Sequence, residues 1–419
     1  MNNSQLPDGY KLTEVGMVPE GWEVQSLEDL TEKHRPISYG IVQTGPNIPS
    51  GIPCLRVIDI DNGRIDKTKL IHTSQKISDG YKRTILKLGD LVMPLRGKVG
   101  DVGIIDSELE GANLTRGVAI IAICSHLSGE FCRHFISWSV TRKRLEQAMN
   151  GSALQEIPIA ALRTFKIGLP SSITEQRSIA TALSDMDELL GGLDRLIAKK
   201  HDLKQAAMQK LLRSETGWIE YLFSDVCWFQ EGPGVRNHQF TTSGVKLFNG
   251  TNIEKGKIDL DKTNRYISEK EAFGWYSHFM ADIGDIVIAC SGISIDKFDE
   301  KVSVIKAQHL PLCMNTSTMR FKVNLGKIDK SYLQQFLRSN EFKEQIGDKA
   351  TGSAQLNFGP SHVSAVKIWL PELSEQTAIA SILSDMDTEI AAIEQRRNKT
   401  RDLKQAMMQE LLTGRIRLV

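Results

Sequence analysis

A block of 38 residues occurs twice in this chain, at a constant offset of 200 residues. Residues 175–212 and 375–412 align without a gap and are identical at 19 of 38 positions, which chance does not produce. Shorter matches precede both copies in the same order, such as LGDLV at 88–92 and IGDIV at 283–287. An internal repeat of this kind indicates one structural plan that is built twice.

The repeated block predicts a long helix in each half of the chain. Prolines close the preceding segments, and Thr174 and Ser374 are predicted N-caps. Apolar residues then recur at spacings of four and three, which is typical of a coiled-coil seam. Two matching seams separated by a domain favour an antiparallel pair, so these positions are predicted to pair the helices or to bind a partner. They are Ile179, Leu183, Met186, Leu190 and Leu193 in the first copy, and Ile379, Leu383, Met386, Ile390 and Ile393 in the second.

The segments outside the block have a different pattern. Short β-branched runs separated by turn residues predict strands, among them residues 54–60, 118–123, 286–289 and 319–323. One helix is expected in each half, over residues 131–149 and 330–346. The predicted class is α+β: two domains with mixed or antiparallel sheets, joined by two long antiparallel coiled-coil helices in a pseudo-twofold repeat. The predicted boundaries are 1–168 for the first domain, 169–214 for the first helix, 215–369 for the second domain, 370–414 for the second helix and 415–419 for a tail.

The charge balance limits how such a chain could bind nucleic acid. It has 52 Lys and Arg against 51 Asp and Glu, a formal charge of +1. Nucleic-acid binders usually carry a basic excess, so any such role must depend on local patches or on a basic partner. The sequence has no apolar run of the ~18–20 residues that span a bilayer, a polar N-terminus, and six Cys without a CxxC pair. We therefore expect a cytoplasmic protein that does not bind membranes.

The unequal divergence of the two halves suggests two different roles. The helices are half identical, so we expect them to do the same thing twice, such as docking two copies of one partner. The domains are far less alike, so we expect them to bind two different things. An asymmetric, split DNA site fits this arrangement, because half-site spacing mirrors protein geometry. Pattern alone leaves open an alternative, a two-headed coiled-coil scaffold that binds proteins instead of DNA.

The plan resembles the specificity (S) subunit of Type I restriction-modification enzymes. The similarity covers nearly the whole chain: VPEGWE at 18–23 and TGW at 216–218 resemble the domain starts, the EQ pairs at 175–176 and 375–376 the helix starts, and the GDLV and GDIV segments the sheet-and-loop motif. Two departures are the Gly pair at 191–192 inside the first helix and the lack of an Arg in the second domain matching Arg96.

The resemblance implies a non-catalytic subunit with two target recognition domains, each reading one half of a bipartite, asymmetric sequence in double-stranded DNA. The helices would set the half-site spacing and dock two methyltransferase (M) subunits, and restriction (R) subunits would complete an ATP-dependent nuclease. S-adenosylmethionine, ATP and Mg²⁺ would belong to those partner subunits, so we expect no cofactor here.

The sequence lacks the motifs that a methyltransferase or an ATPase would need for catalysis. No Pro-Pro occurs, as the adenine-methyltransferase tetrapeptide would require, and no P-loop is present. Cys124, His126, Cys132 and His134 could in principle form a zinc site, but the second half lacks all four. We therefore predict no metal site and no catalytic residue.

Two glycine-containing loops in each domain are the predicted DNA contacts. Arg suits guanine and Gln or Asn suits adenine in the major groove, whereas Lys more often binds phosphate. The candidates are Arg96, Lys98, Ser152 and Gln155 in the first domain, and Ser291, Ser294, Lys297, Ser353, Gln355 and Asn357 in the second.

Overall fold

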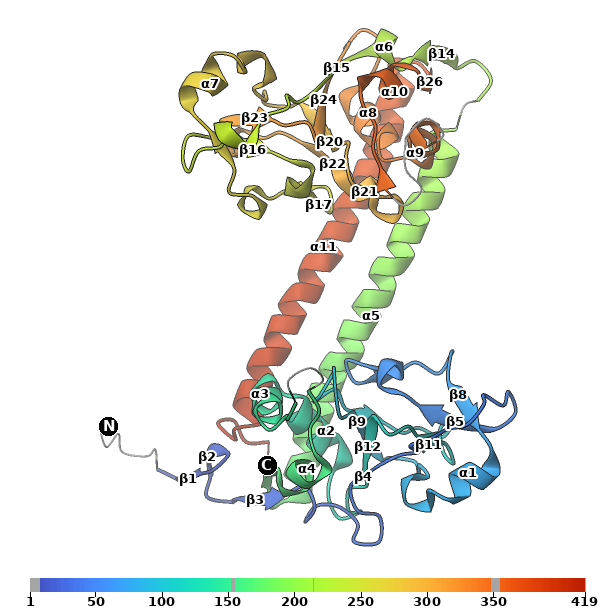
Figure 1. Cartoon of the computed structure of the whole chain (residues 1–419), viewed down its shortest axis with the longest axis vertical. Coiled ribbons are helices and arrows are strands. Elements are labelled where there is room, and N and C mark those ends of the chain that lie inside the picture. The colour runs from blue at the N-terminus through green and yellow to red at the C-terminus, as the bar shows by residue number, and fades with distance from the viewer. Residues whose placement is uncertain (1–7, 152–154, 214, 348–354, 419) are drawn as a thin grey trace. The chain divides into compact units, whose positions relative to one another are not determined.

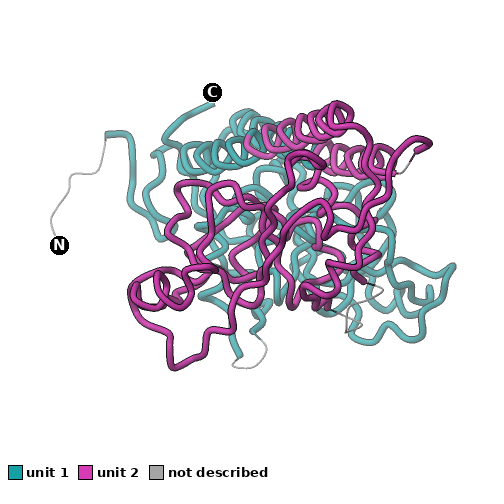
Figure 2. The backbone as a smooth tube through the Cα atoms, turned by 90° about the horizontal axis from the view of Figure 1, so that it is seen from above, with its two compact units in different colours: residues 1–194, 396–419 teal, residues 195–395 magenta. Residues whose placement is uncertain are grey.

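The computed structural model describes residues 8–151, 155–213, 215–347 and 355–418. Its packing forms two compact units, residues 1–194 with 396–419 and residues 195–395 (Figure 2). Two helices of 39 residues, α5 (Ile173–Leu211) and α11 (Leu373–Leu411), each contribute to both units (Figure 1). Each unit therefore contains one globular domain and one part of each long helix. No helix in the described residues has both the length and the apolar character needed to cross a membrane.

The first domain is built around two small sheets. A four-stranded antiparallel sheet has the order β10 (Gly103–Ile104), β9 (Leu91–Pro94), β12 (Val118–Ile121), β4 (Ser38–Tyr39). A three-stranded mixed sheet has the order β11 (Asn113–Leu114), β5 (Ile52–Leu55), β8 (Ile71–Thr73), with β11 parallel to β5. Every residue of β9 and β12 is buried, which explains why both strands are continuously apolar instead of alternating.

Short strand pairs and helices complete the first domain. The pairs are β1 (Tyr10–Thr13) with β2 (Gly16–Pro19), β3 (Trp22–Ser26) with β13 (Lys166–Pro170), and β6 (Ile60–Asp61) with β7 (Arg64–Ile65). The helices are α1 (Gln75–Asp79), α2 (Gly129–Ser137), α3 (Ser139–Gln147) and α4 (Ile159–Thr164).

The second domain repeats this plan. Its four-stranded antiparallel sheet has the order β15 (Cys227–Glu231), β24 (Thr318–Val323), β20 (Ile286–Ala289), β22 (Val302–Val304), and its three-stranded mixed sheet has the order β19 (Tyr266–Ile267), β16 (Val245–Phe248), β23 (Leu312–Met314). The pairs are β14 (Ile219–Leu222) with β26 (Lys367–Leu370), β17 (Ile253–Glu254) with β18 (Lys257–Ile258), and β21 (Ile293–Ser294) with β25 (Gln355–Leu356). The helices are α6 (Phe223–Val226), α7 (Glu269–Phe273), α8 (Lys330–Phe336), α9 (Asn340–Gly347) and α10 (Pro360–Ser364).

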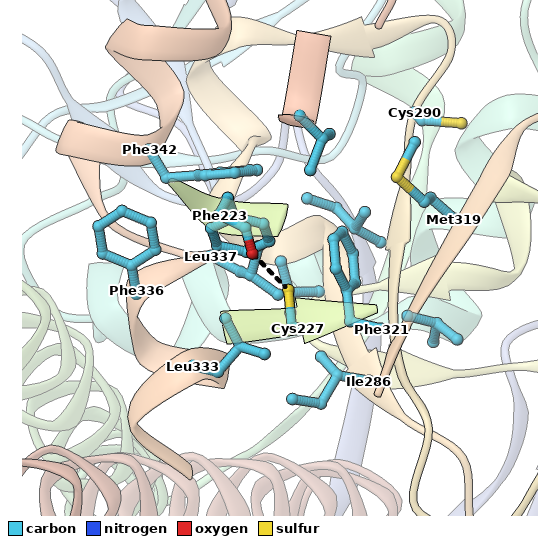
Figure 3. Packing of buried hydrophobic residues seen from close by; sticks show 14 of the residues in the cluster. Phe223, Cys227, Ile286, Cys290, Met319, Phe321, Leu333, Phe336, Leu337 and Phe342 are labelled. Carbon is cyan, nitrogen blue, oxygen red and sulfur yellow. Dashed lines mark hydrogen bonds between the residues drawn. The ribbon is translucent and has the colours of Figure 1, made fainter. Parts of the chain in front are cut away.

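An aromatic cluster forms the core between the sheet and the helices of the second domain (Figure 3). Phe223 lies at its centre, with its ring edge-on to Phe321 at 5.8 Å and its centroid 5.8 Å from that of Phe342. Phe336 of α8 stacks on Phe223 at 6.1 Å. Aromatic pairs at these separations add to the stabilisation from buried area, so α8 and α9 are fixed firmly to the sheet.

The predicted α+β class is confirmed, but the prediction of one helix per domain is wrong. The first helix breaks at Trp138, whose extended backbone directs its ring onto Phe135 at 6.1 Å. The second ends before Ser339, whose hydroxyl accepts the N–H of Phe342 at 3.2 Å and caps a new helix. Two short helices therefore replace each predicted long one. In the second domain the serine hydroxyl explains the break, because serine competes with helix continuation by making such local bonds.

The strand predicted over residues 54–60 is also wrong at residues 56–59, which lie between the end of β5 at Leu55 and the start of β6 at Ile60. The carboxylate of Asp59 accepts the backbone N–H of Arg56 at 2.8 Å and pairs with its guanidinium. This local bonding folds residues 57–59 into a 3₁₀ turn. A run of β-branched residues therefore does not guarantee an extended chain where an Asp can bond to the backbone nearby.

The long helices begin one residue before the predicted N-caps. Because α5 starts at Ile173 and α11 at Leu373, Thr174 and Ser374 lie inside the first turns. The carbonyls of Ser172 and Glu372 instead accept the first helical N–H bonds, from Gln176 and Gln376, at 3.1 and 3.0 Å.

Buried glutamines explain the repeated Glu-Gln motif. Gln176 donates to the carbonyl of Pro170 at 2.8 Å and accepts the N–H of Ser128, the N-cap of α2, at 3.0 Å. Gln376 likewise donates to Pro371 at 2.9 Å and accepts the N–H of Asp329, the N-cap of α8, at 2.8 Å. Each glutamine thus ties a long helix to the first helix of its domain.

Candidate nucleic-acid interface

Four of the predicted DNA-contact residues in the second domain lie on one exposed ribbon. Strand β21 pairs antiparallel with β25, which places Ser294 opposite Gln355. The side-chain oxygen of Asn357 accepts the N–H of Gly292 at 2.8 Å and the hydroxyl of Ser291 at 2.9 Å. The backbone of Gly292 is left-handed, with φ of 68°, which permits this tight approach. The ribbon presents short polar side chains on a fixed backbone.

The first domain pairs the same two loops, with different side chains. Arg96 forms an isolated antiparallel bridge with Glu156, so the exposed Gln155 lies next to Arg96 in the paired loops. A backbone bond from Ile157 to Leu95, at 2.9 Å, corresponds to the bond from Phe358 to Cys290, also at 2.9 Å. Both domains therefore present a two-loop surface of equivalent backbone design.

The other predicted DNA-contact residues differ in their surroundings. The ammonium of Lys98 bonds to Asp61 at 2.5 Å, so this cation is already partly neutralised. Lys297 is exposed at the end of a 3₁₀ turn, Ile295–Lys297, that is held down by the buried Phe298. Ser152 and Ser353 lie outside the described residues.

The repeated Gly-Asp motif is a structural ion pair. Asp90 pairs with the guanidinium of Arg35, and both side chains are less than a tenth exposed. Asp285, its counterpart, pairs with Arg320 at 3.0 Å in the same buried setting. Breaking a buried pair of this kind is strongly destabilising, because it leaves a charge without a partner. Asp90 and Asp285 are therefore buried residues that stabilise β9 and β20, the strands from which the loops extend.

Ion pairs show that the long helices run antiparallel within each unit. In the first unit, Lys404 bonds to Asp187 at 2.5 Å and Arg397 lies 3.5 Å from Asp194, so one helix descends as the other ascends. The second unit has the equivalent contacts: Lys204 with Asp387 at 2.5 Å and Lys200 with Glu389 at 2.6 Å. Asp187 and Asp387 are not among the residues predicted from the sequence. The occurrence of the same Asp in both copies of the repeat is the sequence feature that could have indicated them.

The predicted seam positions are all buried or half-buried. Those near the helix starts, Ile179 and Leu183 in α5 and Ile379 and Leu383 in α11, pack into the cores of their own domains. Leu193 and Ile390, further along, are 6% and 5% exposed. The apolar stripe therefore attaches each long helix to a domain at its start. Pairing of the helices through Leu193 and Ile390 stays a prediction.

Metal-ligating side chains do not gather in the described part of the chain. The described residues include no group of three or more His, Cys, Asp or Glu side chains that could hold a metal ion. Burial raises the pKa of the Cys132 and Cys290 thiols to about 12, so neither supplies a thiolate. His134 is 1% exposed and bonds to Ser184 at 3.0 Å, a contact between α2 and α5. Cys132 and His134 are therefore buried side chains of the α2 region that pack against the rest of the first unit.

Comparison with known protein families shows which family this chain belongs to. The family profile described as the Type I restriction modification DNA specificity domain matches residues 19–198 and again residues 215–400. The chain belongs to this family. The family profile starts twice, once in each domain, and runs into each long helix, in agreement with the internal repeat.

Individual relatives agree with this assignment. The chain is 24% identical over 444 residues to a putative Type I restriction enzyme MjaX specificity subunit of Methanocaldococcus jannaschii, covering 98% of this chain and 97% of that one. It is 28% identical over 213 residues to the EcoBI specificity subunit of Escherichia coli, covering 50% and 44%. The fold is similar to that of the crystallised S subunit of a Type I system from M. genitalium, with a TM-score of 0.58, 14% identity and coverage of 96% and 97%. A second structure, from work on assembly of the Type I restriction-modification system, has a TM-score of 0.60 at 17% identity, covering 95% and 99%.

Proposed function

We propose that this specificity subunit reads a bipartite, asymmetric DNA sequence, one half with each domain, and that it recruits two methyltransferase subunits through its long helices. It performs no chemistry of its own in this proposal. S-adenosylmethionine, ATP and Mg²⁺ are bound by the methyltransferase subunits and by the restriction subunits that join the complex.

The observation that carries the DNA-reading part is the two-loop surface that recurs with different side chains. Arg96 and Gln155 occupy it in the first domain, and Ser291, Ser294 and Gln355 in the second. Equivalent backbones with different hydrogen-bonding groups suit two half-sites of different sequence, because donors and acceptors on the side chains select bases in the major groove.

The identical, exposed face of the two helices supports docking of two copies of one partner. Core packing explains why buried positions stay alike, but it does not explain identity at exposed ones. Leu203 and Leu403 are 47% and 54% exposed although both are large and apolar. The neighbouring exposed positions are also identical in the two copies: Asp202 and Asp402, Gln205 and Gln405, and Ala206 and Ala406. A partner that covers this face accounts for both the exposure and the identity.

The experiment is to express the full chain with its cognate methyltransferase subunits and to map methylated sites in genomic and random-sequence DNA. We expect one split target with two unlike halves. Arg96→Gln is expected to change the preference in one half only, and the exposed cation variant Lys69→Gln is the matched control. Ser294→Ala with Gln355→Ala is expected to change only the other half.

Two results would contradict this proposal. Methylation or binding without any sequence preference would favour the protein scaffold, as would tight association with proteins in the absence of DNA binding. A change in both halves from Arg96→Gln alone would contradict the assignment of one half to each domain.

A further inference from the structure

The same three-part charge cluster occurs in each unit where a domain meets the long helices. An Asp of one long helix bonds to a Lys of the other, Asp187 with Lys404 and Asp387 with Lys204, both at 2.5 Å. The lysine side chains are only 18% and 12% exposed. These pairs are therefore better shielded from solvent than a typical surface salt bridge, which contributes little.

A guanidinium from the globular domain completes each cluster. In the first unit, Nη2 of Arg133 lies 3.6 Å from the second carboxylate oxygen of Asp187. In the second unit, Nη1 of Arg338 lies 3.3 Å from the second oxygen of Asp387, and its Nη2 donates to the carbonyl of Val302 at 3.1 Å. Each cluster thus joins three elements: one domain and both long helices.

The two guanidinium groups come from positions that do not correspond. The N-caps Ser128 and Asp329 align α2 with α8, so Arg133 matches Gln334 and Arg338 matches Ser137. The arginine has moved by one helical turn between the two domains, since residues four apart lie on the same face of a helix.

The guanidinium groups nevertheless occupy equivalent places. The hairpin turn between β6 and β7 has two left-handed residues, Asn62 and Gly63, and so does the turn between β17 and β18, Lys255 and Gly256. A Cβ placed on Gly63 would lie 3.6 Å from Nη1 of Arg133, and one placed on Gly256 would lie 3.1 Å from Nη2 of Arg338. The charged group and its surroundings are retained in both halves, although the residue that supplies it differs.

We propose that these Asp–Lys–Arg clusters are the joints that orient each recognition domain on its helices, and that Arg133, Asp187, Arg338 and Asp387 are positioning residues for half-site spacing. The proposal rests on the proposed function in its reference to DNA. Inserting one base pair moves a half-site by about 3.4 Å along the duplex and about 35° around it. A domain held by a rigid joint discriminates against that displacement, whereas a loosened domain follows it.

Exchange of the arginine position is the decisive test. The full chain, in complex with its methyltransferase subunits, would carry Arg133→Met or the double change Arg133→Met with Ser137→Arg, which places the arginine at the position that Arg338 has in the second domain. We expect Arg133→Met to reduce the preference for the native spacer over spacers one base pair longer or shorter about tenfold. The double variant should restore it, while base preference within each half-site stays unchanged in both. Lys143→Met, at an exposed cation on α3, is the matched control.

Hydrogen exchange on the full chain separates this proposal from the DNA-reading function. We expect faster exchange of α2 amides in Arg133→Met and in the nearly isosteric Asp187→Asn, recovery in the double variant, and no change in α8. The proposal that the cluster is a joint would be refuted if α2 exchange were unchanged. It would also be refuted if Ser137→Arg restored neither the spacer preference nor the α2 exchange rate. Altered exchange with intact spacer discrimination would overturn the cluster's positioning role, whereas a complex that selects no DNA would overturn only the function proposed above.

Discussion

His134 makes the stability of the first unit depend on pH in a direction that can be worked out. Its imidazole is 1% exposed on α2. Burial, followed by the charges of Arg133 and Lys404, lowers its pKa from 6.5 to about 2. Asp187 lies 3.9 Å from its Nδ1 and favours the charged form, but the burial and the two cations outweigh it. The folded chain therefore keeps this histidine neutral over the whole range in which an unfolded chain would protonate it.

The magnitude follows from proton uptake by the unfolded state. Because the folded pKa lies below the unfolded one, the full stability is present above pH 6.5 and is lost as the pH falls. The loss from this one group is about 1.4 kcal/mol at pH 5.5 and about 2.7 kcal/mol at pH 4.5. His134→Gln introduces the residue found at the matching position of the second domain, Gln335, and removes this term.

The assay is urea unfolding of the wild-type chain and of His134→Gln between pH 7 and 4.5, followed by hydrogen exchange in α2 and β3. Exchange in the second unit serves as an internal control, because a two-unit chain need not unfold in one step. We expect the wild type to lose about 2.5 kcal/mol more than the variant over this range. Parallel pH dependences for the two proteins would refute the reasoning.

Two further substitutions test how the long helices are held. In a thermal scan, Arg417→Ala should destabilise the first unit by about 2 kcal/mol, because it leaves the 1% exposed carboxylate of Glu175 without its bidentate partner. The control Arg415→Ala, at a half-exposed cation, should destabilise it by less than about 0.5 kcal/mol. Leu183→Ala should cost about 2–5 kcal/mol, because Leu183 is fully buried in the core of the first domain, whereas Leu203→Ala at a 47% exposed site should barely change the melting temperature. Equal effects within either pair would contradict the burial argument.

The internal repeat made the architecture predictable, because an exact 200-residue offset requires two copies of one plan. The α+β class and the long helices followed from the change of apolar period along the chain. The breaks near Trp138 and Ser339 could not be predicted, since they depend on where an aromatic ring or a capping hydroxyl finds its partner in three dimensions. Local hydrogen bonding by Asp59 likewise overrode the strand propensity of its neighbours.

The candidate site was predictable only as loops. Glycine and small polar residues indicated two loops per domain, and the structure pairs Ser294 with Gln355 and Arg96 with Glu156. That Lys98 is bonded to Asp61 depends on a contact between distant segments that no local pattern carries. The shift of an arginine from position 133 in one half to 338 in the other hides the charge cluster from a residue-by-residue alignment of the repeat.

The first unit is made from two stretches of chain that are synthesised far apart in time. Its core takes in Met408, Leu411 and Leu412, whereas the second unit draws on one continuous stretch, residues 195–395. At about 5–20 residues per second, a ribosome needs roughly 10–40 s between completing residue 194 and reaching those side chains. During that interval the nascent first domain lacks part of its interior, so the half that is translated first is the half that finishes folding last.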